Sequence, residues 1–348
     1  MRVVQVGCGK MSAFTMRYAL ERNAELVGAY DVVPSKIGQD VSTVIGGEKV
    51  GVAIESFDDL DASLKRVKPD IAIITTQSLM RSIFPTIEIL AQNGVNGVSI
   101  CEELFYGWDS DPLTASLIDQ VAKAGGVTFT GSGYQDVSWG SMVTALAATA
   151  ASIEKIRGIS SYNLEDYGLE TAAQHGAGLS PAEFDEKILK VNNVSPEKQA
   201  ALIAGGEFLP GYMWPVNGWI ASALGLNVTK RTQRGEATAH TEDLYSETLG
   251  KTIAAGDPTG LKTIVEFETA EGVTIVTECI GNVFAPGEID LNDWNVEGEP
   301  DMKLGLDSPA TVEMTCACCV NRMPDVIAAD PGYVTSEKMP ALAFRRRF

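Results

Sequence analysis

The feature that most constrains this chain is a glycine turn that follows an apolar strand at the N-terminus. Residues 2–6 read RVVQV, and GCGKM follows at 7–11 and opens a helix. In the fingerprint G-x-G-x-x-G/A, the first glycine permits the tight turn and the second lets the backbone approach a pyrophosphate. Ser12 takes the third position as a small but imperfect match. The turn is predicted to contact a dinucleotide through Gly7, Cys8, Gly9, Lys10 and Met11.

A second strand at 25–31 ends in Asp31. An acid about 20 residues after the glycines typically holds the adenosine ribose hydroxyls. Its charge would repel the 2′-phosphate of NADP at close range and so favours NAD. Lys36 could soften this preference by offering that phosphate a cation. The predicted cofactor is therefore NAD or NADP.

Strands alternate with helices through the N-terminal part of the chain. Further strands are predicted at 70–76, 98–101 and 127–130, with helices at 81–93 and 111–124. The run at 70–76 is rich in β-branched residues, which suits a parallel strand buried on both faces. This order is typical of βαβ units, so residues 1–133 are predicted to form a doubly wound parallel α/β sheet of the Rossmann type.

The following region has a different pattern. The predicted elements are an apolar helix at 138–151, strands at 156–162, 262–269 and 272–280, and a helix at 311–321. A short loop containing Gly272 joins two of these strands as a hairpin. Residues 134–307 are therefore predicted to form an α+β domain for substrate binding and dimerisation, while 308–348 returns to complete the first domain. A sheet with one free face favours a homodimer.

Charge and composition exclude several classes of partner. Lys and Arg total 27 against 46 Asp and Glu, so the formal charge of −19 would repel nucleic acid. No stretch reaches the roughly 18 apolar residues of a membrane helix, and the N-terminus does not resemble a signal peptide. We therefore expect a cytoplasmic protein with no membrane partner. The six cysteines lack zinc-ligand spacing, so no metal is expected.

Two adjacent acids, Glu102 and Glu103, follow the strand at 98–101. Ligands of open α/β sheets bind outside the carboxyl ends of the strands. A carboxylate there can accept a proton from an amine or bond to an iminium. Strand alternation predicts that the two acids point in opposite directions, so that one of them faces the crevice. The residues alone do not say which.

Polar strand ends and aromatic residues complete the candidate site. The strand ends are predicted to contact the cofactor through Thr75, Thr76, Ser78 and Cys101. Aromatic side chains after the domain crossover favour a mostly apolar substrate pocket. The substrate-binding residues predicted for it are Tyr134, Trp139, Tyr162 and Tyr167, with His175 from a loop.

Five segments together resemble a known family. They are Gly7–Met11, Cys101–Leu104, Gly131–Gly133, Gly176–Phe184 and Asp330–Val334. In this order and spacing they are similar to the 2,4-diaminopentanoate dehydrogenases and the native amine dehydrogenases grouped with them, which share a fold with dihydrodipicolinate reductase. The resemblance covers nearly the whole chain and implies the same dihydrodipicolinate reductase-like fold.

The resemblance implies reversible oxidative deamination of an amine with NAD(P), or reductive amination of a ketone or aldehyde with ammonia in the other direction. Carried over, Glu102 would be the catalytic carboxylate, and the four aromatic residues would line the substrate cavity. Dihydrodipicolinate reductases proper use two adjacent histidines and a lysine, whereas His175 stands beside Gly176. A diamino acid substrate would need a cation to bind its carboxylate. The segment 134–178, which carries the aromatic residues, offers only Lys155 and Arg157. Small carbonyl substrates fit better.

Two other functions remain open at this point. One is a 2,4-diaminopentanoate dehydrogenase, or a dihydrodipicolinate reductase-like enzyme with a carboxylated substrate. The other is a catalytically silent protein that binds NAD(P) as a sensor. The acid Glu102 and the aromatic residues favour an enzyme, whereas nucleotide binding without oxidation of any amine would favour the sensor.

Overall fold

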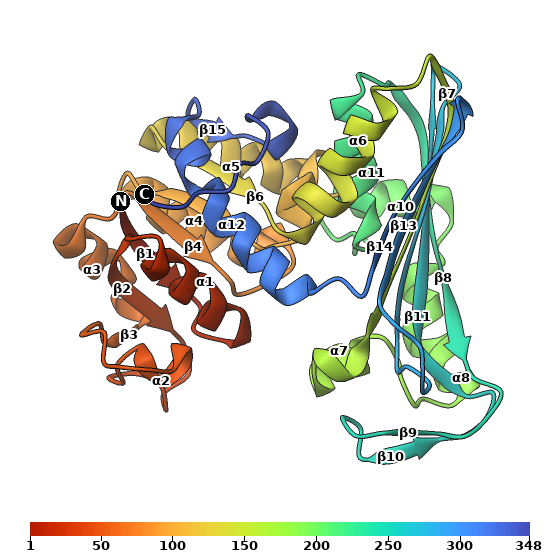
Figure 1. Cartoon of the computed structure of the whole chain (residues 1–348), viewed down its shortest axis with the longest axis horizontal. Coiled ribbons are helices and arrows are strands. Elements are labelled where there is room, and N and C mark those ends of the chain that lie inside the picture. The colour runs from red at the N-terminus through yellow and green to blue at the C-terminus, as the bar shows by residue number, and fades with distance from the viewer. The chain divides into compact units, whose positions relative to one another are not determined.

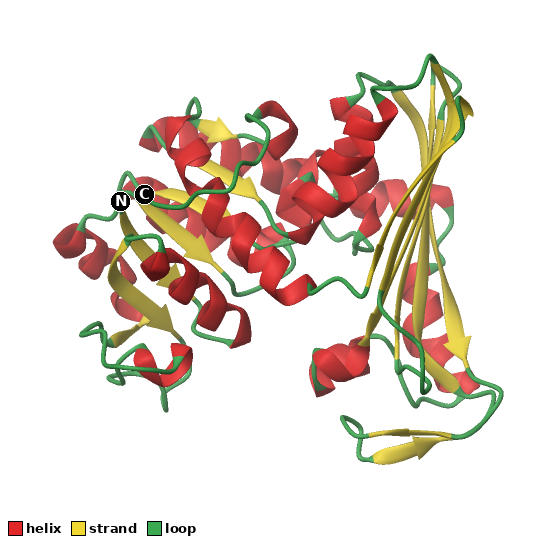
Figure 2. Ribbon diagram, viewed as in Figure 1, coloured by secondary structure: helices red, strands yellow, loops and turns green.

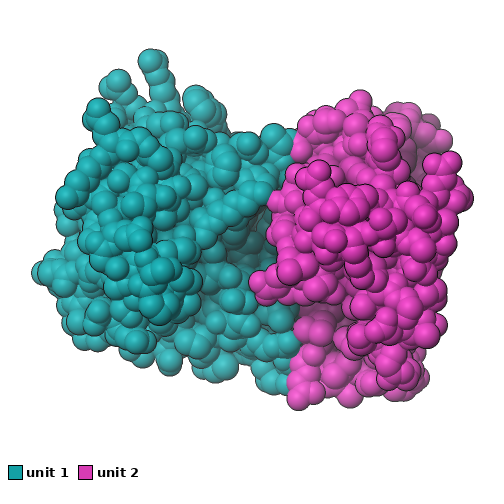
Figure 3. Space-filling model, turned by 90° about the horizontal axis from the view of Figure 1, so that it is seen from below, with its two compact units in different colours: residues 1–141, 204–206, 310–348 teal, residues 142–203, 207–309 magenta.

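The computed structural model describes residues 1–348 and divides into two compact units (Figure 1). The first unit comprises 1–141, 204–206 and 310–348, and the second comprises 142–203 and 207–309, as coloured in Figure 3. The boundaries expected from the sequence fall at 133/134 and 307/308. No helix is both long and apolar enough to cross a membrane.

The first unit is built on a parallel sheet with strand order β15-β6-β5-β4-β1-β2-β3. Its strands are β1 (Arg2–Val6), β2 (Glu25–Asp31), β3 (Ile54–Ser56), β4 (Ile71–Ile74), β5 (Asn96–Ser99), β6 (Thr128–Gly131) and β15 (Gly332–Tyr333). The chain winds outward from β1 in one direction and from β4 in the other. The switch point between β1 and β4 is where ligands of such sheets bind. The predicted α/β fold of the Rossmann type is confirmed.

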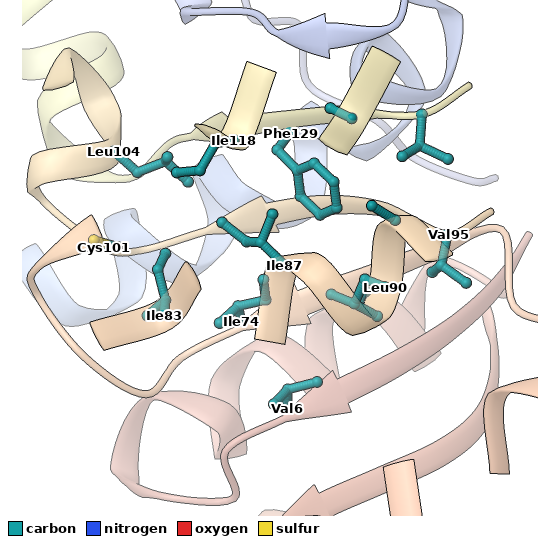
Figure 4. Close-up of a cluster of buried hydrophobic side chains, with 14 of the residues drawn as sticks. Val6, Ile74, Ile83, Ile87, Leu90, Val95, Cys101, Leu104, Ile118 and Phe129 are labelled. Atoms are coloured by element: carbon teal, nitrogen blue, oxygen red, sulfur yellow. The ribbon is translucent and has the colours of Figure 1, made fainter. Parts of the chain in front are cut away.

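Helices cover both faces of this sheet, which explains the apolar character of its central strands. They are α1 (Lys10–Glu21), α2 (Ser42–Ile45), α3 (Leu60–Val67), α4 (Met80–Gln92), α5 (Pro112–Gly125) and α12 (Thr311–Ala328). On β4, Ile74 packs into the cluster drawn in Figure 4 with Ile87 of α4 and Ile118 of α5. Ile73 of the same strand joins a second cluster with Val320 of α12. Strand β4 is therefore buried on both sides, as predicted.

Several elements differ from the prediction; the largest differences and one near the candidate site are as follows. Helix α12 continues to Ala328 although Pro324 lies inside it. Met323 and Val326, on either side of this proline, pack into the buried cluster, and that burial outweighs a cost of about 3 kcal/mol for an internal proline. The predicted helix at 138–151 is instead a π-helix over Gln135–Ser141 followed by α6 (Met142–Ala147). Strand β5 ends at Ser99, so residues 100–101 are not part of it.

The second unit contains a twisted sheet of long strands, drawn in yellow on the right of Figure 2. It has six strands in the order β14-β13-β7-β12-β11-β8. The strands are β7 (Ser152–Asn163), β8 (Val228–Ala239), β11 (Pro258–Thr269), β12 (Thr274–Asn282), β13 (Leu291–Glu299) and β14 (Met302–Asp307). Only β12 and β7 pair in parallel. The predicted hairpin is β11–β12, in which Val265 lies opposite Thr277.

Shorter elements complete this unit. They are the ribbon β9 (Leu244–Ser246) and β10 (Lys251–Ile253), and the helices α7 (Leu169–Gln174), α8 (Pro181–Phe184), α9 (Lys190–Asn192), α10 (Pro196–Ala204) and α11 (Met213–Ala223). Helix α11 is almost entirely buried, and Asn217 fixes it to the sheet through its side-chain amide. That amide donates to the carbonyls of Val265 and Ile275 and accepts from the Thr277 hydroxyl.

Candidate active site

The first glycine of the turn has no room for a side chain. Gly7 has φ +86°, and a Cβ atom built there would lie 2.7 Å from the Thr76 side chain and 3.0 Å from the carbonyl oxygen of Thr75. The Thr75 hydroxyl also donates to the Gly7 carbonyl at 3.0 Å and accepts from Gln5 at 2.9 Å. The end of β4 therefore braces the turn, and Gly7 is required both by its backbone angle and by this close approach.

The second glycine faces open space. A Cβ at Gly9 would meet no protein atom within 4 Å. Gly9 caps α1, which has no side-chain cap and no acid in its first turn. An uncapped helix N-terminus of this kind is the geometry that binds anions in proteins. Ser12 is fully buried and donates its hydroxyl to the Gly9 carbonyl at 2.6 Å. These features fit a pyrophosphate group.

The carboxylate of Asp31 already has protein partners. It accepts from the backbone N–H groups of Cys8 and Val33, each at 2.8 Å, and from the Lys36 ammonium at 3.1 Å. Burial alone would raise the pKa of Asp31, but these hydrogen bonds outweigh it and lower the pKa. Burial raises the pKa of the Cys8 thiol to about 12, and this protonated thiol donates to the Tyr30 carbonyl at 3.6 Å. Asp31 therefore ties the end of β2 to the glycine turn.

The two adjacent acids do not continue a strand, so the alternation argument was wrong. Glu102 has helical backbone angles and leads into a turn of 3₁₀ helix at Glu103–Phe105. Glu103 is 2% exposed, and its oxygens accept from the Met80 N–H at 2.8 Å and the Ser110 hydroxyl at 2.7 Å. Glu103 therefore holds this loop against the start of α4.

Glu102 is placed differently. It is only partly buried, and the hydroxyl of Ser78 is its side-chain hydrogen-bond partner. Burial raises the pKa of this carboxyl above its ordinary value. Neighbouring Cys101 is fully buried, and burial raises its thiol pKa well above the usual range. Of the two acids, Glu102 is the less buried, whereas both oxygens of Glu103 are used to hold the loop.

Two of the predicted aromatic residues lie in the first unit after β6. Tyr134 and Trp139 pack edge to face, with ring centroids 5.5 Å apart, and both are buried. The indole Nε1 of Trp139 is buried without a hydrogen-bond partner. A buried donor in this state costs free energy unless a ligand supplies an acceptor.

An ion pair that the sequence reasoning missed fixes the π-helix that carries Trp139. Arg322 of α12 donates to both oxygens of Asp136 at 2.9 Å, and both side chains are at most 1% exposed. The Ser132 hydroxyl also donates to Asp136 at 2.9 Å. The sequence offers no local signal for this pair, because α12 also contains Glu313, Asn321 and Asp325.

The remaining predicted aromatic residues lie in the second unit. Tyr162 of β7 bonds through its hydroxyl to His175 Nε2 at 2.6 Å, and the Nδ1 atom lies 2.8 Å from the Thr171 carbonyl. Burial lowers the pKa of His175, so the neutral ring donates from Nδ1 and accepts the tyrosine proton at Nε2. Tyr167 and the unpredicted Tyr212 pack on Tyr162, with centroids 5.3 and 6.3 Å away.

The second unit also has an open hollow of about 240 Å³. It is lined by Asn163, Asp166, Phe284, Glu288, Ile289, Asp290, Ser308 and Pro309. None of the predicted substrate-binding residues belongs to it. No group of three or more His, Cys, Asp or Glu side chains is arranged to hold a metal ion.

Comparison with known proteins identifies the family. The family model of the 2,4-diaminopentanoate dehydrogenase C-terminal domain matches residues 138–344. The chain belongs to this family. Among solved structures, an amine dehydrogenase from Mycobacterium smegmatis is 36% identical to this chain over 100% of this chain and 98% of its own, with a TM-score of 0.88. The family expected from the sequence motifs is thus confirmed.

Two further proteins are more distantly similar to this chain. The 2,4-diaminopentanoate dehydrogenase of Acetoanaerobium sticklandii is 22% identical, covering 97% of this chain and 93% of its own length. A probable dehydrogenase from Thermotoga maritima is 12% identical over 97% of this chain and 92% of its own, with a TM-score of 0.58, and shares the fold. The chain is therefore an NAD(P)-dependent oxidoreductase of the amine dehydrogenase type.

Proposed function

We propose that this oxidoreductase catalyses the reductive amination of small ketones or aldehydes with ammonia, and the oxidative deamination of the corresponding amines in reverse. The observation that carries the proposal is the position of Glu102, which is only partly buried and whose carboxyl has a raised pKa, next to an acid whose oxygens are both used in packing. It lies in the loop after β5, at the carboxyl edge of the sheet where ligands of this fold bind.

Glu102 would serve two steps. Ammonia adds to the carbonyl carbon to give a carbinolamine, which must take up a proton to lose water and become an iminium cation. A carboxyl group with a raised pKa keeps its proton to a higher pH than an ordinary glutamate and can supply it to the carbinolamine. The carboxylate that remains then stabilises the cation electrostatically in a partly dehydrated site. In the deamination direction the same group receives the proton back.

The nicotinamide, when bound, supplies or accepts the hydride. The residues proposed to hold the cofactor are Gly7, Cys8, Gly9, Lys10, Met11, Asp31, Thr75, Thr76, Ser78 and Cys101. The open space at Gly9 and the uncapped start of α1 support this assignment. The buried cysteines would take part through their backbone groups, since burial keeps both thiols protonated.

Substrate binding is proposed for Tyr134 and Trp139 in the first unit and for Tyr162, Tyr167 and His175 in the second. Their apolar rings favour small uncharged carbonyl compounds. A substrate carboxylate would need a cation. Arg157, one of the two that the segment offers, is already paired with Glu297 at 2.5 Å. This pairing is a reason to place amino acid substrates second.

We also propose that the second unit mediates a homodimer. Helices α6 and α11 pack on one face of its sheet (Figure 1). On the other face, the strand register places Ile159, which is 39% exposed, beside Glu278 and Asp293. A second copy of this chain would cover such a mixed apolar and polar surface. Light scattering after size-exclusion chromatography tests this, and a monomer at assay concentration would contradict it.

The function is tested by following NADH and NADPH consumption with ammonia across a panel of ketones and aldehydes. Oxidation of 2,4-diaminopentanoate is measured in parallel. Turnover of small carbonyl compounds supports the proposal, whereas efficient oxidation of the diamino acid alone supports the carboxylated-substrate alternative. Nucleotide binding without any turnover would support a sensor.

A further inference from the structure

We propose that Lys36, and not Asp31, sets the discrimination between NAD and NADP, and that its ammonium group binds the 2′-phosphate of NADP. The inference rests on the use of NAD(P) by this family and does not depend on the amine substrate. Lys36 lies in the loop after β2, and its Nζ atom lies 2.8 Å from the Cys8 carbonyl and 3.1 Å from Asp31 Oδ2.

Asp31 cannot repel a phosphate as an isolated carboxylate would. Its negative charge is compensated by the ammonium of Lys36. An ionised carboxylate offers about four acceptor positions, and three are used by the N–H groups of Cys8 and Val33 and by Lys36. The position that remains can accept one ribose hydroxyl, so NAD still binds. The pair as a whole presents no net charge to the nucleotide.

Lys36 retains a group that can recognise phosphate. An ammonium carries three N–H donors, and two of them go to Cys8 and Asp31. The Lys36 side chain is 32% exposed, whereas that of Asp31 is only 8% exposed. The remaining donor capacity and the exposed charge of Lys36 could therefore serve a phosphate bound beside the glycine turn.

The surroundings of this pair also fit the adenosine end of a nucleotide. Val32 and Val33, which follow Asp31 directly, are 73% and 38% exposed. Exposed valines beside a charged pair offer an apolar surface that a purine ring can cover. The same loop therefore combines an apolar contact for adenine, one acceptor for the ribose and a cation for the 2′-phosphate.

The alternative is that Lys36 is only a structural link between the end of β2 and the glycine turn. The two roles predict different results. A structural link supports the turn for any dinucleotide, so its loss would weaken NADH and NADPH binding equally and lower the melting temperature. A phosphate contact changes the ratio of the two dissociation constants.

The test uses the full-length protein without amine or ketone. Dissociation constants for NADH and NADPH are measured by calorimetry for the wild type, Lys36→Met and Lys36→Arg, and the melting temperature is recorded for each. Adenosine 2′,5′-bisphosphate and adenosine 5′-monophosphate serve as probes of the adenosine end alone. Lys123→Met is the matched control, because Lys123 also forms an ion pair, with Asp119 on α5.

The wild type is expected to bind NADPH and NADH within about tenfold of each other, which corresponds to about 1.4 kcal/mol. Lys36→Met should weaken NADPH and the bisphosphate at least about tenfold more than NADH and the monophosphate. Lys36→Arg should retain NADPH binding, and Lys123→Met should change neither ratio. Equal weakening of both cofactors by Lys36→Met, or a wild type that binds NADH far more tightly than NADPH, would overturn the inference.

Discussion

Replacing Glu102 by glutamine is the most direct test of the proposed chemistry. Glutamine keeps the size of the side chain and an oxygen that can accept from the Ser78 hydroxyl, so the loop should keep its conformation. The variant removes both the dissociable proton and the negative charge. Ser78 is the one proposed cofactor residue that is hydrogen-bonded to the Glu102 side chain, and the amide oxygen keeps this bond. The dissociation constants of NADH and NADPH should therefore be unchanged.

The size of the effect follows from the two roles that are lost. General acid or base catalysis by one side chain contributes about 10² to 10⁴ in rate, and one preorganised electrostatic contact contributes about 10² to 10³. One carboxyl group provides both, so the two factors are not independent. We expect kcat for amination of a small ketone to fall by about 10² to 10⁴.

The pH dependence gives a second measurement. Burial raises the pKa of Glu102 in the folded enzyme, and deamination requires the ionised form opposite the iminium. The deamination rate of the wild type should therefore rise with pH through a limb that lies above the ordinary glutamate value of about 4.3. In Glu102→Gln this limb should disappear, because no group titrates at that position.

Glu103→Gln is the matched control. Glu103 accepts hydrogen bonds from the Met80 N–H and the Ser110 hydroxyl in the interior, so this variant should lower the melting temperature and leave the pH limb in place. Turnover of Glu102→Gln within about tenfold of the wild type, with the limb intact, would refute the assignment. A selective loss of the limb in Glu103→Gln would transfer the role to the other acid.

The remaining predictions concern the turn, the aromatic residues and the buried ion pair. Gly7→Ala should unfold at lower temperature and lose nucleotide binding, because its Cβ would lie 2.7 Å from a threonine side chain. Gly9→Ala should keep the wild-type melting temperature and lose only nucleotide affinity. Thermal unfolding and titration of both variants with NADH test this pair. Trp139→Ala should admit bulkier ketones; a loss of about 3–5 kcal/mol in stability with unchanged relative rates would instead make Trp139 a core residue. Arg322→Met leaves the buried charge of Asp136 unpaired and should cost about 3–5 kcal/mol in urea unfolding, and a cost below about 1 kcal/mol would contradict this.

Elements with local physical causes could be predicted from the sequence. Strand β2 has the predicted bounds. Helix α5 begins where Asp111 caps it, with its side chain accepting from the Thr114 N–H at 3.0 Å, and it ends at Gly126 with φ +67°. A capping side chain and a glycine with positive φ end a helix within a few residues of their own position. The local sequence is therefore sufficient to predict both ends of α5.

The choice between the two acids could not be predicted in this way. Alternation along a strand was the wrong argument, since β5 ends at Ser99 and the chain turns before Glu102. What separates Glu102 from Glu103 is the hydrogen bonding of the latter to Met80, which lies 23 residues earlier. This contact depends on how α4 packs beside the loop. The sequence around the two glutamates does not indicate that packing.

The same limit applies to the residues that position the candidate substrate side chains. Arg322 and Asp136 are 186 residues apart, and neither has a local pattern that distinguishes a buried ion from a surface one. Once the first unit is folded, however, their pairing joins α12 to the π-helix that carries Trp139. Breaking a buried pair by removing one partner is strongly destabilising. The C-terminal helix therefore fixes the position of a candidate substrate residue without being predicted to contact the substrate, and the effect of Arg322 on substrate range should act through Trp139.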